Sequence, residues 1–148
     1  QFLGNITRGT DLSLVDGGLQ RRAFTYVDDG INALIKIIEN KKGIASSKVY
    51  NIGSPENDYS IKDLAEIMMD VAKEFNEYSD IIAKVKVINV KSESYYGKGY
   101  QDVKSRVPWI DNLKDELGWS PKVNLKDGIR SIFKFYKNDI ANARQLID

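Results

Sequence analysis

Two neighbouring arginines follow a glycine pair in "SLVDGGLQRRAF", residues 13–24. Glycines leave backbone amides open to a ligand, and arginine offers a planar, permanently charged set of donors that matches phosphate oxygens. The segment could therefore hold a diphosphate, with Arg21 and Arg22 as the cations. The same residues also suit a plain hairpin with both arginines in solvent, and the residue types alone leave the two interpretations open.

A second candidate is "SESYYGKGYQDVKSR", residues 92–106, which is polar, rich in tyrosine and closed by an arginine. Its two glycines allow the backbone to bend, so the tyrosines could line a wall against a sugar or a base while Arg106 reaches an anionic group. Two other interpretations stay open. The tyrosines could cover a loop with Arg106 as a surface cation, or the segment could be a protein-binding surface, where Tyr and Arg are enriched.

Asp28 and Asp29 invite a paired-carboxylate interpretation, but adjacent side chains at a helix start point apart. We expect one of them to cap a helix instead. The chain has no histidine and no cysteine, which removes imidazole bases, thiol nucleophiles and most zinc sites. We predict no metal site. Neither G-x-G-x-x-G nor G-x-x-x-x-G-K-[ST] occurs, so we expect no cofactor loop in this chain.

The composition is that of an ordinary globular domain. The 148 residues carry 22 basic and 21 acidic side chains and a net charge of +1, which gives no general attraction to nucleic acid. No apolar run approaches the roughly 18 residues of a membrane span, and the first residues lack the pattern of a signal peptide. We predict a cytoplasmic protein without nucleic-acid or membrane partners.

Helices and short strands alternate, which predicts an α/β or α+β class with a small sheet and packed helices. "QFLGNITRG" matches the end of a helix closed by Gly9, and there is no initiating methionine, so we expect a piece of a longer chain. A hairpin or tight turn should join strands at Leu12–Val15 and Ala23–Val27.

A helix should follow and run to Gly43, with Ile31, Leu34, Ile35 and Ile38 as its buried stripe.

"KVYNIG" should be a short buried strand, and Ser60 with Asp63 should form a capping box for the next helix. "AKVKVINV" fits a half-exposed strand followed by a loop. A short helix should stop at Gly118, and Asn124 should cap the last one.

The order of three motifs resembles a known family. "DGGLQRRAFTYVDDGINAL", "VYNIGSPENDYSIKDLAEIM" and "LGWSPKVNLKDGI" are similar to the C-terminal part of the extended short-chain dehydrogenase/reductase family of nucleotide-sugar epimerases, dehydratases and decarboxylases. Within it, "SYYGKGYQDVKSRVPWI" resembles the UDP-glucuronic acid decarboxylases that serve lipid A modification with aminoarabinose and polymyxin resistance.

The resemblance implies that residues 1–148 form a single substrate-binding lobe, whose partner is an N-terminal Rossmann lobe of the same protein that binds NAD. The family's glycine-rich loop and Tyr-x-x-x-Lys pair lie in that other lobe, so the fragment alone should be inactive. The full-length protein should be a homo-oligomer. Two competitors remain: another NAD-dependent epimerase, dehydratase or UDP-xylose synthase, and a non-catalytic binding module.

Carried over by motif, the resemblance implies that Arg106 is the proton donor. A guanidinium with a pKa above about 12 is a reluctant proton donor, and we favour an electrostatic role for it. Tyr100 and a continuous stretch with Arg22 as diphosphate ligand should contact the UDP-sugar. The stretch comprises Ser13, Leu14, Val15, Asp16, Gly17, Gly18, Leu19, Gln20, Arg21 and Arg22.

Overall fold

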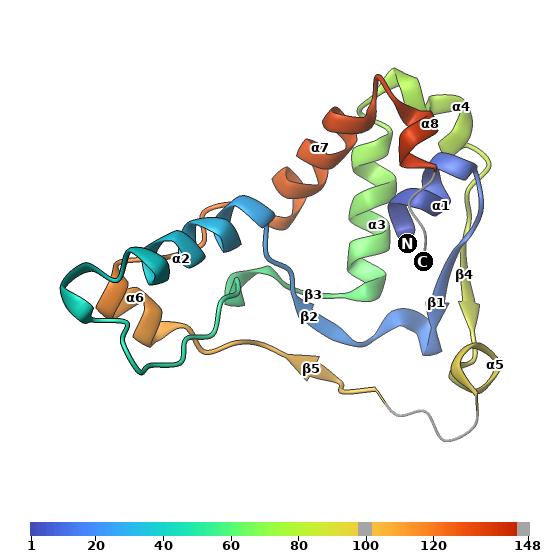
Figure 1. Ribbon diagram of the computed structural model, residues 1–148. Helices are drawn as coiled ribbons and strands as arrows, with labels where there is room; N and C mark the ends of the chain where they lie inside the picture. Colours follow the sequence, from blue (N-terminus) through green and yellow to red (C-terminus); the bar gives the residue numbers. More distant parts are fainter. Residues whose placement is uncertain (98–101, 145–148) are drawn as a thin grey trace. The chain divides into compact units, whose positions relative to one another are not determined.

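The computed structural model describes residues 1–97 and 102–144, and its helices and small sheets confirm the predicted α/β class (Figure 1). The α-helices are α1 Phe2–Arg8, α2 Val27–Glu39, α3 Ile61–Ala72, α4 Ser79–Ile82, α5 Ser92–Tyr96, α6 Asp111–Leu117, α7 Leu125–Tyr136 and α8 Ile140–Ala143. The strands are β1 Leu12–Val15, β2 Arg21–Ala23, β3 Asp58–Ser60, β4 Val87–Val90 and β5 Ser105–Arg106. Within the described residues, no helix has the length and apolar character needed to cross a bilayer.

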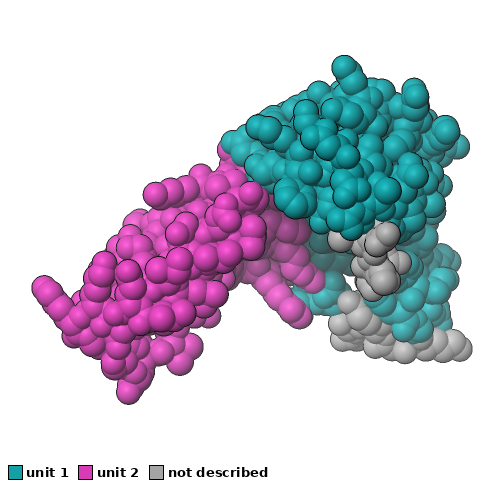
Figure 2. Space-filling model, turned by 45° about the horizontal axis from the view of Figure 1, so that its top comes forward, with its two compact units in different colours: residues 1–20, 60–104, 126–148 teal, residues 21–59, 105–125 magenta. Residues whose placement is uncertain are grey.

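The chain divides into two compact units (Figure 2). Residues 1–20, 60–104 and 126–148 form the first, and residues 21–59 and 105–125 form the second.

The first unit contains the parallel pair β1 and β4, in which Leu12 faces Val87 and Val15 faces Val90. Leu12 and Leu14 are buried, so one face of β1 supplies core side chains. In the same unit, the buried rings of Tyr78 and Phe133 meet edge to face with ring centroids 5.0 Å apart. The Tyr78 hydroxyl donates to the Phe133 carbonyl at 3.2 Å, which satisfies a polar atom inside this core.

The predicted hairpin is wrong. Strands β1 and β2 belong to different sheets, and "DGG" forms a 3-10 turn over Asp16–Gly18. The second strand is Arg21–Ala23 and not Ala23–Val27, because Val27 already begins α2. The glycine pair does make a tight turn, but the chain leaves it toward another sheet.

The second unit is built on a three-stranded sheet of order β3–β2–β5. Ser60, the last residue of β3, is counted with the first unit. Its core joins α2 and α6 through four buried side chains: Ala33, Ile110, Leu113 and Trp119. As predicted, α6 ends at Gly118 in the left-handed conformation, with φ 59°, and Trp119 is buried. Gly9 closes α1 in the same way, and the capping box of Ser60 and Asp63 is present.

Helix α2 exists as predicted, but it ends at Glu39 rather than at Gly43, and its cap and its buried face also differ from the prediction. The residue before the helix is Tyr26, which makes no side-chain cap, and both aspartates fall in the first turn. The expected buried stripe is exposed, with Ile31 at 47% and Ile38 at 80% exposure. The side facing the core carries Asp29 and Ala33 instead.

Two further predictions of secondary structure are wrong. "KVYNIG" is irregular rather than a strand, and Val49 is 87% exposed. The segment after β4 begins with a helix, α5, rather than a loop.

Candidate functional site

Arg22 and Arg106 are direct neighbours on the parallel strands β2 and β5. Partners in such a register lie on the same face of the sheet, on strands about 4.8 Å apart. Arg22 is half-buried and Arg106 is exposed. Within the described part of the chain, the Arg106 guanidinium has no hydrogen bond or ion pair. Two guanidinium groups on one face form a cationic surface suited to an anionic ligand.

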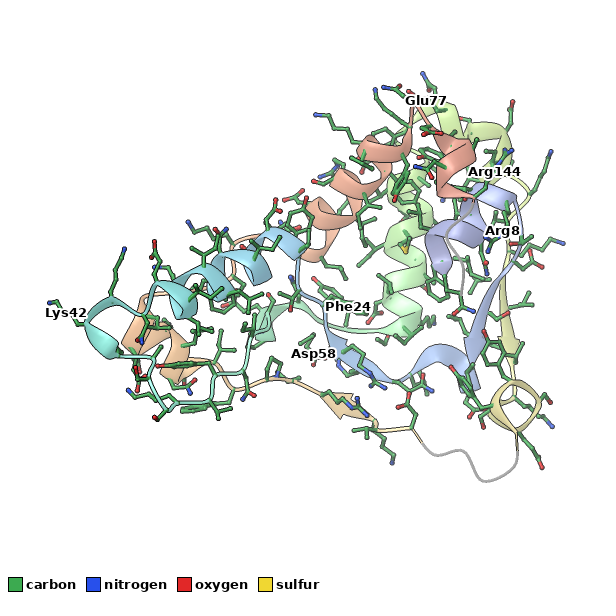
Figure 3. All side chains as sticks on the ribbon, viewed as in Figure 1. Arg8, Phe24, Lys42, Asp58, Glu77 and Arg144 are labelled. Atoms are coloured by element: carbon green, nitrogen blue, oxygen red, sulfur yellow. The ribbon has the colours of Figure 1, made fainter. Side chains whose placement is uncertain are left out.

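Arg21 lies on the opposite face of β2, because successive side chains of a strand alternate. Its Nε donates to the Asp58 carboxylate at 3.0 Å, and a terminal nitrogen donates to the Asp58 carbonyl oxygen. Figure 3 labels Asp58 beside β2. Arg21 therefore ties β2 to β3. From the sequence, Arg21 was grouped with Arg22, and the role of Asp58 was not predicted. The only signal for Asp58 is that it is an acidic residue directly after a turn.

Asn57 fixes the far end of β2. Its side-chain amide donates to the carbonyl oxygens of Phe24, at 3.1 Å, and Val123, at 2.9 Å. Its carbonyl oxygen accepts from the Leu125 backbone amide at 3.1 Å. The side chain is buried and three of its hydrogen-bonding positions are filled, so it holds together segments that are distant in the sequence. No local pattern in the sequence indicated this role.

Asp29 connects α2 to the segment after Trp119. Its carboxylate accepts from the backbone amides of Lys122, at 3.0 Å, and Val123, at 2.9 Å. The Trp119 indole nitrogen donates to the Asp29 carbonyl oxygen at 3.0 Å. Asp29, one of the two aspartates that we expected to cap this helix, is thus a buried link within the second unit.

An open hollow of about 470 Å³ lies beside β5. Its lining residues are Asn51, Ser105, Arg106, Val107, Pro108 and Trp109. The Asn51 side-chain amide donates to the Trp109 carbonyl oxygen at 3.1 Å, which joins two walls of the hollow. A Cβ atom at Gly53 would clash with the Pro108 ring, so glycine is required for this close approach. Arg106 therefore borders a space open to small molecules.

The other predicted contacts, Ser13–Gln20, belong to the first unit. Ser13, Leu14 and Val15 lie on β1, where the Leu14 side chain is buried. Asp16, Gly17 and Gly18 form the 3-10 turn, Leu19 is exposed, and the Gln20 side chain donates to the Val15 carbonyl oxygen at 3.4 Å. Tyr100 lies outside the described residues.

Asp16 receives a specific interaction at this turn. Its carboxylate accepts the Ser92 backbone amide at 3.0 Å. Hydrogen bonds from the side chain and then the backbone of Ser92 lower the Asp16 pKa below its usual value. The turn is thereby fixed to the start of α5.

The comparisons with known proteins agree with this fold. A family model described as GDP-mannose 4,6 dehydratase matches residues 1–132. The crystal structure of the PbgP3 protein from Burkholderia pseudomallei is 48% identical, with a TM-score of 0.88, over 100% of this chain and 40% of that one.

Two more distant structures show the same fold. UDP-glucuronic acid 4-epimerase from Bacillus cereus, in complex with UDP-glucuronic acid and NAD, is 23% identical over 93% of this chain and 38% of that one, with a TM-score of 0.73. The dTDP-glucose 4,6-dehydratase from Bacillus anthracis, in complex with NAD, is 18% identical over the same shares, 93% and 38%, with a TM-score of 0.67.

The matches extend over most of this chain, whereas the chain spans only about two fifths of PbgP3 and the other two enzymes. The chain belongs to the extended short-chain dehydrogenase/reductase family, whose members are NAD-dependent enzymes acting on nucleotide sugars. It corresponds to the C-terminal part of that fold.

Proposed function

We propose that this chain is the single substrate-binding lobe, residues 1–148, of a cytoplasmic NAD-dependent oxidative decarboxylase. The enzyme converts UDP-glucuronic acid to UDP-4-keto-pentose and CO2, in the modification of lipid A with aminoarabinose that gives polymyxin resistance. The observation that carries the proposal is the pairing of Arg22 with Arg106, because this substrate has two anionic groups, a diphosphate and a carboxylate. A cation for each is what the pair supplies.

The two arginines have separate parts. Arg22 binds the diphosphate. Arg106 faces the sugar carboxylate, beside the hollow at β5. Arg21 contributes by fixing the strand that carries Arg22, through its bonds to Asp58.

NAD supplies the oxidation of the sugar C4 hydroxyl to a ketone when it is bound, and the N-terminal lobe of the same protein binds it. The chain contains no dinucleotide-binding glycine motif of its own. The exposed apolar residues of α2 support the existence of such a covering lobe, since a lone domain seldom leaves a stripe of this kind in water. The full-length enzyme is a homo-oligomer.

Arg106 then acts on a β-keto acid. The bond between C5 and the carboxylate carbon breaks, CO2 leaves, and the electron pair moves into an enolate on the C4 oxygen. The fixed charge of a guanidinium stabilises that developing negative charge. A proton must then reach C5, and because arginine keeps its protons at ordinary pH, we assign Arg106 the electrostatic part of the step.

The test is product analysis of the protein that contains this chain, incubated with UDP-glucuronic acid and NAD. We expect CO2 and a UDP-4-keto-pentose in equal amounts. A UDP-uronic acid epimer without CO2 would identify an epimerase, and UDP-xylose would identify a decarboxylase that reduces its ketone again. Binding of UDP-glucuronic acid without any product would leave a non-catalytic binding module.

A further inference from the structure

Strand β3 runs antiparallel to β2. The Phe24 backbone amide donates to the Asn57 carbonyl oxygen at 3.1 Å, just beyond one end of the pair. At the other end, the Ile61 amide donates to the Gln20 carbonyl oxygen at 3.0 Å. Residue numbers rise along one strand as they fall along the other, which is the antiparallel arrangement. The central residue of β3 therefore lies opposite the central residue of β2.

These two central residues are Tyr59 and Arg22. The contact of Asp58 with Arg21 places both of those side chains on one face of the sheet. Side chains alternate along a strand, so Tyr59 and Arg22 share the opposite face. Arg106 is the partner of Arg22 on the other side. The residues Tyr59, Arg22 and Arg106 thus form one row across the three strands.

The Tyr59 side chain is half-buried. In the part of the chain that the structure describes, it has no hydrogen bond and no ring contact. Aromatic rings beside a binding surface commonly receive the flat face of a base or of a sugar ring. Tyr59 is therefore the third side chain of this face that can contact a ligand.

We propose that Tyr59 packs against the nucleoside half of a nucleoside-diphosphate sugar. This inference rests on the proposed function, in which Arg22 binds the diphosphate and Arg106 faces the sugar. The diphosphate lies in the middle of such a ligand, as Arg22 lies in the middle of the row. The group beyond Arg22, on the side away from Arg106, is then the nucleoside. Strands are spaced about 4.8 Å apart, so a short, extended ligand can reach all three side chains.

The experiment measures the affinities of UDP and of inorganic diphosphate for the whole protein that contains this chain, by calorimetry. Tyr59→Leu should weaken UDP binding about tenfold, the usual scale of a lost base–aromatic contact, and leave diphosphate binding unchanged. Tyr59→Phe keeps the ring and should stay within about twofold of the parent for UDP. Tyr136→Leu removes a half-buried tyrosine of α7 and is the matched control.

The results distinguish a failure of the Tyr59 proposal from a failure of the proposed function. If Arg22→Ala weakens both probes and Tyr59→Leu changes neither, the row holds an anion but Tyr59 is not a ligand contact, and the inference is overturned. Equal weakening of UDP and diphosphate by Tyr59→Leu would indicate a structural role and would overturn it too. If Arg22→Ala changes neither probe, the proposed function itself fails.

Discussion

Arg21 and Arg22 are neighbours in the sequence but lie on opposite faces of β2, and the Arg21 Nε is 3.0 Å from the Asp58 carboxylate. Arg22 emerges on the other face, next to Arg106. The two arginines of this three-residue strand therefore have different roles: Arg21 anchors β2 to β3, and Arg22 lies beside Arg106. This difference gives the first prediction.

Arg22→Ala should weaken binding of UDP-glucuronic acid about 10- to 100-fold, because a hydrogen bond to a charged group contributes roughly 1.5–3 kcal/mol. Arg21→Ala should change the affinity less than about fivefold, since a half-exposed ion pair contributes at most about 1 kcal/mol. Calorimetry on the two variants makes the comparison. Equal losses for both would mean that the two faces of β2 are not separated in function.

The link from α2 to Lys122 and Val123 gives a prediction about stability. Asp29→Ala leaves two partly buried backbone amides without their acceptor and should lower the free energy of unfolding by about 1–2 kcal/mol. Asp28→Ala, an exposed neighbour in the same turn, should cost much less. Urea unfolding of both variants tests this. A loss at Asp28 as large as that at Asp29 would assign the effect to helix charge rather than to the buried link.

Asp16 gives a prediction about pH. Hydrogen bonds from Ser92 lower its pKa from the usual 3.8, so the folded state is favoured while the carboxylate is ionised. This contribution is complete above pH 3.8 and is lost as the pH falls through the lower pKa of the folded state. NMR titration of the Asp16 side-chain carboxyl carbon should show a midpoint below 3.8. Ser92→Ala, which removes the side-chain bond, should move the midpoint upward, and an unchanged midpoint would contradict the proposed cause.

The exposed apolar stripe of α2 gives a prediction about the N-terminal lobe that we propose to cover it. Ile35→Asp should lower the melting temperature of the whole protein by several degrees and affect the 148-residue chain alone far less, because only the whole protein buries the new charge. Asn32→Asp, at an exposed position of the same helix, is the control. Equal effects on the chain and on the whole protein would show that the stripe stays in water.

Local signals were predicted well from the sequence. Gly9 and Gly118 end their helices, and Ser60 with Asp63 starts another, because each depends on residues within one helical turn. The tight turn at Asp16–Gly18 was one of two predicted alternatives, and the other, a hairpin, is wrong. The actual partner of β1 is β4, far along the chain, and no local pattern encodes such pairing.

Exposure was predicted less well, for a physical reason. The amphipathic pattern of α2 shows that one face is apolar, but not which part of a protein covers it. "KVYNIG" has the composition of a strand, yet strand geometry needs a neighbouring ladder that this segment does not have among the described residues. At the candidate site, family resemblance named Arg22 and Arg106, but their pairing and the roles of Asp58 and Asn57 depend on contacts between distant segments.

The doubled arginine of β2 also affects how the strand should tolerate insertion and deletion during evolution. A shift of one residue turns every side chain of a strand to the opposite face. With a single arginine, such a shift would remove the positive charge beside Arg106. Because Arg21 and Arg22 are identical, a shift that moves Arg21 to the position of Arg22 would still present a guanidinium there, although the tie to Asp58 would be lost. The turn at Asp16–Gly18 can therefore gain one residue with a loss of strand anchoring rather than of ligand charge.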